Sequence, residues 1–129
     1  MRKFVAALAA GLLITGSTAG AAFAHHSVSA QFDLKKSVKM QGVLVKLDNI
    51  NPHAYWHFDV KTPSGKVERW SLEALPPAAL RRLGVKIKED VVVGKTYDFV
   101  ISPAFKAGTT GLLTFITING KEYRMTVGV

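Results

Sequence analysis

The segment His53–Ala74 constrains the fold most, because apolar and polar residues alternate on both sides of a turn signal. Thr62-Pro63-Ser64-Gly65 fits a type I turn with glycine in the left-handed position, which favours a hairpin with a three-residue loop. Such a loop pairs Thr62 with Lys66 and thereby fixes the register of both strands. That register places apolar residues opposite each other: Phe58 with Trp70, Trp56 with Leu72 and Ala54 with Ala74.

Four further segments predict strands, at residues 37–47, 96–102, 112–118 and 121–127. In the first of these, the apolar residues move after Gly42 to the odd positions 43, 45 and 47, which predicts a bulge or bend at that glycine. Asn119-Gly120 joins the last two segments and is a strong signal for a tight hairpin. Residues 76–84 begin with two prolines and end in glycine, which predicts a helix of two turns.

A helix between the third and fourth strands is the connectivity of the OB-fold, a small five-stranded Greek-key barrel. We therefore expect an all-β domain with one short helix over residues 37–129, preceded by an N-terminal arm at residues 25–36. A bent first strand suits this barrel, because one strand must take part in both sides of the barrel. The alternative is a small β-sandwich.

The first 24 residues have the order of a signal peptide. A basic start is followed by an apolar run shorter than the about 20 residues that span a bilayer, and then by Ala22-Phe23-Ala24, which fits a cleavage site. We expect cleavage after Ala24 and a periplasmic location. The mature chain then has no candidate transmembrane segment, and its side-chain charge falls from +8 to +6 with the loss of Arg2 and Lys3.

The chain contains no cysteine, so an exported domain of this size must be held together by packing rather than by disulfides. Its positive charge favours acidic partners, such as an anionic small ligand or an anionic partner in the cell envelope. Nucleic acid is not expected as a partner in the periplasm. The sequence leaves the oligomeric state open.

Several short motifs follow one another in a distinctive order. They are Ala-His-His-Ser at residues 24–27, Asn-Pro-His at 51–53 and Trp-x-x-Glu at 70–73, followed by proline, leucine, arginine and glycine between residues 76 and 84. The ordered set resembles a family of small exported bacterial proteins of unknown function. Residues 87–100 depart from the Leu-x-Pro-Gly-Asp that this family usually has before its next strand. The resemblance implies no activity.

Cleavage after Ala24 makes His25 the first residue, so its α-amino group and its ring nitrogen can chelate one metal ion. A second imidazole, from His53 or from the neighbouring His26, completes a T-shaped site of three nitrogens. Copper(II) prefers nitrogen ligands in a square-planar frame. A free α-amine titrates at about pH 7.7–8.0, so copper can displace its proton at neutral pH. We therefore expect His25, His26 and His53 as metal ligands, with copper as the first candidate.

The hairpin register places Glu73 opposite Tyr55 and diagonal to His53, within reach of long side chains. Glu73 is therefore expected to accept a hydrogen bond from the His53 ring or to ligate the metal directly. Asn51 and Tyr55 are further candidates for these two roles.

His57 lies four residues beyond His53, about 13 Å along a strand, so the two histidines cannot bind one ion. His57 and Trp70 are instead candidates for a ligand-binding face. Trp70 also falls on the apolar phase of its strand and so fits a core position.

Two functions from different classes fit these observations. The first is a periplasmic binding protein for a transition metal, and the alternative is a metal-free OB-fold module that binds an anionic ligand or an envelope partner. An enzyme is the third alternative, but the chain has no cysteine nucleophile, no G-x-S-x-G, no phosphate-binding glycine loop and no H-E-x-x-H. We expect binding rather than catalysis.

Overall fold

The computed structural model describes residues 28–50 and 52–126 of the chain. The chain divides into two units, Met1–Ala30 and Gln31–Val129. Of the first unit the structure describes residues 28–30, which begin a helical turn that ends at residue 31. The second unit contains the named elements β1 (Val38–Asp48), β2 (Ala54–Lys61), β3 (Val67–Ala74), α2 (Pro77–Arg82), α3 (Ile87–Asp90), β4 (Thr96–Pro103), β5 (Thr110–Ile118) and β6 (Lys121–Arg124).

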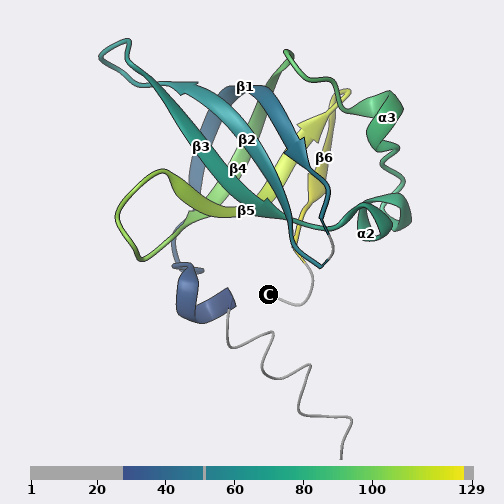
Figure 1. Ribbon diagram of the computed structural model, residues 1–129, viewed down its shortest axis with the longest axis horizontal. Coiled ribbons are helices and arrows are strands. Elements are labelled where there is room, and N and C mark those ends of the chain that lie inside the picture. Colours follow the sequence, from purple (N-terminus) through teal and green to yellow (C-terminus); the bar gives the residue numbers. More distant parts are fainter. Residues whose placement is uncertain (1–27, 51, 127–129) are drawn as a thin grey trace, which may run out of the picture. The chain divides into compact units, whose positions relative to one another are not determined.

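The strands form a closed barrel of five strands with β6 as an additional strand (Figure 1). Their order is β3-β2-β1-β4-β5-β6, and a parallel pairing of β3 with β5 closes the barrel. Helices α2 and α3 connect β3 to β4, on the right of the view in Figure 1. The expected small all-β barrel with a helix after its third strand is therefore confirmed, with a second short helix that the sequence did not predict.

The β2–β3 hairpin has the register that its turn predicts. The Thr62 amide donates to the Lys66 carbonyl over 2.7 Å, and Gly65 has the left-handed φ of +87° that the loop requires. Figure 1 shows this hairpin extending at the upper left of the view. All three expected apolar pairs are present: Phe58 with Trp70, Trp56 with Leu72 and Ala54 with Ala74.

Strand β1 serves two partners, as expected, but its irregularity lies elsewhere than predicted. Its first half pairs with β4 and its second half with β2, and the register with β2 shifts between Leu44 and Lys46. Leu44 is fully buried, whereas Val43 and Val45 are only partly buried. The predicted change of phase at Gly42 is therefore wrong, because the inward phase continues through residue 44 and changes at the bulge.

Gly42 has a different role, which is to let β1 approach β2. A Cβ atom at this position would lie 2.9 Å from the Asp59 carbonyl oxygen and 2.9 Å from Val60 Cγ2. Neither distance is compatible with an undisturbed side chain, so the close crossing of the two strands requires glycine.

The barrel interior is filled by the apolar faces of all its strands. Trp56, Phe58 and Leu72 are fully buried, and the Phe58 and Phe99 rings lie 4.3 Å apart between centroids. Leu80 of α2 joins the same cluster. Packing of this kind gives a domain without disulfides its stability.

The ends of the elements follow local signals in most places. Pro77 opens α2, and Gly84, with a φ of +86°, follows its end, as predicted. Asn119 and Gly120 both have positive φ, as a type I′ hairpin requires. Strand β6 ends at Arg124, earlier than predicted, and β5 begins two residues earlier, at Thr110.

Candidate functional site

The polar residues of β2 lie on the face opposite to Trp56 and Phe58. The register places Tyr55 opposite Asp48 of β1 and Glu73 of β3, and His57 opposite Lys46 and Ser71. We call the outward side chains of Lys46, Asp48, His53, Tyr55, His57 and Glu73 the histidine face. It lies over β1, β2 and β3.

His53, directly before β2, is paired with Glu73 of β3. Its Nδ1 lies 2.6 Å from Glu73 Oε1, and the side chains of His53 and Glu73 are 50% and 11% exposed. The carboxylate is thus largely covered while the imidazole reaches solvent. Within the described part of the chain, His53 Nε2 has no hydrogen-bond partner. The predicted contact between these two side chains is present.

His57 belongs to a separate cluster with two residues of β1. Its Nε2 lies 2.8 Å from Asp48 Oδ2, and the Lys46 ammonium lies 3.0 Å from the other carboxylate oxygen. The hydrogen bond from Lys46, and then that from His57, lower the pKa of Asp48. The strand predicted at residues 37–47 ended before Asp48, so this contact was not predicted.

Tyr55 lies between the two histidine clusters. Burial, and then the negative charge of Glu73, raise the pKa of its phenol. The phenol therefore stays protonated at neutral pH and is available as a hydrogen-bond donor rather than as an anionic ligand.

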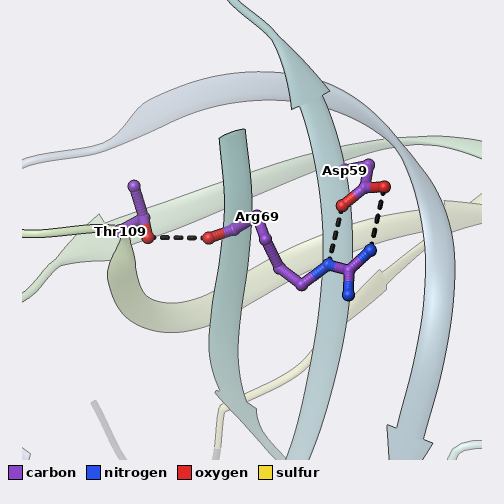
Figure 2. Close-up of polar contacts among 3 residues, drawn as sticks. All are labelled: Asp59, Arg69 and Thr109. Atoms are coloured by element: carbon purple, nitrogen blue, oxygen red, sulfur yellow. Dashed lines mark hydrogen bonds and ion pairs between the residues drawn. The ribbon is translucent and has the colours of Figure 1, made fainter. Parts of the chain in front are cut away.

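An ion pair extends the polar surface of β2 towards the hairpin tip (Figure 2). The Arg69 guanidinium donates to both carboxylate oxygens of Asp59, from Nε over 2.8 Å and from Nη2 over 3.1 Å, and this lowers the pKa of Asp59. The Thr109 hydroxyl donates to the Arg69 carbonyl over 2.7 Å. These contacts join β2, β3 and the β4–β5 loop. The side chains of Asp59 and Arg69 are occupied by each other, so we assign them a role in stabilising the fold.

The remaining candidates lie elsewhere or outside the described residues. Trp70 pairs with Phe58 and packs against the core, so it lies on the side of the sheet opposite to His57. His25, His26 and Asn51 are outside the described residues. Among the described residues, no group of three histidine, aspartate or glutamate side chains could hold a metal ion. The two histidines of the face are bound to different carboxylates and do not converge.

Comparison with known proteins gives a family but no activity. A family of unknown function (DUF6152) matches residues 13–114. The chain belongs to DUF6152. This agrees with the expected membership in a family of unknown function. No curated protein and no solved structure matches the chain. In the part of the DUF6152 chain that the structure describes, no helix is long and apolar enough to cross a membrane.

Proposed function

We propose that the protein is an exported periplasmic binding protein that binds a transition metal, copper(II) first, through His53 and a mature N-terminus at His25. The observation that carries this proposal is the pair of His53 and Glu73. Histidines that bind metals usually donate their other ring N–H to a carboxylate, which fixes the tautomer and makes the ligating nitrogen more basic. The Nδ1–Oε1 distance of 2.6 Å and the half-exposed imidazole support this role for His53.

One imidazole is a weak site by itself, so the proposal needs further ligands. Cleavage after Ala24 would give His25 an α-amine and a ring nitrogen that chelate the same ion. Together with His53 Nε2 these make three nitrogen ligands, a set that suits copper(II). His26 is the alternative third ligand and would need no contribution from the barrel.

Calorimetric titration of residues 25–129 with copper(II) tests this proposal. We expect one ion to bind at neutral pH. His53→Ala and one extra glycine before His25 should each weaken binding strongly, and Glu73→Gln should weaken it about 10–100-fold through loss of the histidine's carboxylate partner. His57→Ala is the matched control, since that ring is held by Asp48, and it should leave the affinity unchanged.

The outcomes of this titration separate the alternatives. Equal affinity of wild type and His53→Ala would show that the arm alone, through His25 and His26, binds the ion. That result would rule out the site on the barrel. No copper binding at all would favour the second candidate function, a metal-free module for an anionic ligand or envelope partner, which the net charge of +6 after residue 24 supports.

A further inference from the structure

An open groove of about 440 Å³ crosses β1, β4, β5 and β6, on strands other than those that carry His53, His57 and Glu73. Its volume lies in the range of small-ligand sites. Val100 of β4 pairs with Phe115 of β5, and both side chains are half-buried. Their neighbours Phe99 and Ile116 are buried in the core, so alternation turns Val100 and Phe115 outward. They form an apolar centre for the groove.

Charged side chains of opposite sign line the two sides of this centre. Lys39 of β1 pairs with Val100, and Glu122 of β6 pairs with Thr117. Both side chains are exposed, and neither makes an ion pair or hydrogen bond with another described residue. Asp98 adds a second carboxylate, although one of its oxygens already accepts a hydrogen bond from Gln41 over 2.8 Å.

The spacing of these charges sets the size of a complementary ligand. Lys39 lies in line with Val100, Phe115 and Arg124 across the sheet, and Glu122 is two residues from Arg124 along β6. Three strand-to-strand steps and this offset place the backbones of Lys39 and Glu122 about 16 Å apart. A tripeptide in extended form spans about 10 Å between its ends, and the long lysine and glutamate side chains bridge the remainder. A free amino acid is too short to contact both charges at once.

We propose that this groove binds short peptides with free ends and an apolar central side chain. The peptide carboxylate would pair with the Lys39 ammonium, and the peptide ammonium would pair with the Glu122 carboxylate. The central side chain would cover Val100 and Phe115. The two charged contacts would orient the peptide, and burial of its apolar side chain would provide the free energy of binding. This ligand requires no metal and does not depend on His25 or on the histidine face.

Titration of isotope-labelled, chelator-treated protein with Ala-Phe-Ala, followed by NMR, tests the groove. Amide signals of residues 39–41, 98–100, 115–117 and 122 should shift, whereas those of residues 53–57 should not. The capped peptide acetyl-Ala-Phe-Ala-amide has the same side chains without charged ends, and it should bind about tenfold more weakly. Lys39→Gln and Glu122→Gln should each weaken binding of the free peptide about threefold.

Lys106→Gln and Glu89→Gln are the matched controls, because they remove the same charges at exposed positions outside the groove. They should leave the affinity unchanged. Equal binding of the free and capped peptides would overturn the proposal. So would equal losses in the groove and control variants, or shifts confined to other surfaces. An absence of amide signal shifts at millimolar peptide would overturn it as well. None of these results tests the proposed copper site, which lies on other strands.

Discussion

The two faces of β2 are built in different ways, although their residues alternate along one strand. On the inner face, Trp56 and Phe58 are fully buried and contact many apolar neighbours. On the outer face, His57 and Asp59 each contact one or two charged or polar side chains on a neighbouring strand. Burial of a large aromatic contributes far more to stability than an exposed ion pair does. The inner face therefore stabilises the fold, and the outer face is free to carry a function.

Trp56 gives the largest expected effect and the strongest test of this contrast. Trp56→Ala should lower the free energy of unfolding by about 3–5 kcal/mol, because it leaves a cavity in the barrel. The control is His57→Ala, one residue away on the outer face, for which we expect a much smaller loss. Urea unfolding of both variants measures the difference. A small effect of Trp56→Ala would mean that the inner and outer faces of β2 have been exchanged.

The sequence predicts the β2–β3 hairpin well because one local signal fixes its register. The turn at residues 62–65 sets the pairing, and the pairing brings Glu73 to His53. Three-residue loops of this kind leave little freedom, so a prediction at the turn extends along both strands. The contact of His53 with Glu73 could therefore be predicted before the structure was known.

The β1–β2 pairing lacks such a signal, and the cluster of His57 with Asp48 was missed for that reason. The bulge between Leu44 and Lys46 shifts the register by one residue, and no single residue type marks it. The bulge was predicted at Gly42 instead, because a glycine in a strand is compatible both with a bulge and with the close approach of a neighbouring strand. The parallel contact of β3 with β5 also joins segments far apart in the sequence, which local patterns do not specify.

Gly42 provides the second prediction, with an intermediate effect. Gly42→Ala should destabilise the barrel by about 1–3 kcal/mol, because its methyl group meets the Asp59 carbonyl and the Val60 side chain. Val38→Ala, at the exposed start of the same strand, is the control and should change stability little. Thermal unfolding of both variants gives the comparison. If Gly42→Ala is as stable as wild type, β1 and β2 do not approach as closely as described.

Asp48 provides the prediction with the smallest effect, and it concerns the outer face alone. Its folded pKa is lowered, first by the Lys46 hydrogen bond and then by that of His57, so its contribution to stability is present above the unfolded pKa of about 3.9. That contribution is lost as the pH falls through the lower folded pKa. Wild type should therefore be slightly more stable than Asp48→Asn at pH 7, and the difference should shrink towards pH 3. Urea unfolding at several pH values measures it.

Two further variants assign the cause of this pH dependence. Because Lys46 lowers the pKa of Asp48 most, Lys46→Gln should reduce the pH-dependent part of the stability more than His57→Gln does. A larger effect of His57→Gln would make the imidazole the main partner of Asp48. A difference between wild type and Asp48→Asn that stays constant or grows towards acid would contradict the lowered pKa. In that case the polar contacts of His57 would not distinguish the outer face of β2 from an ordinary solvated surface.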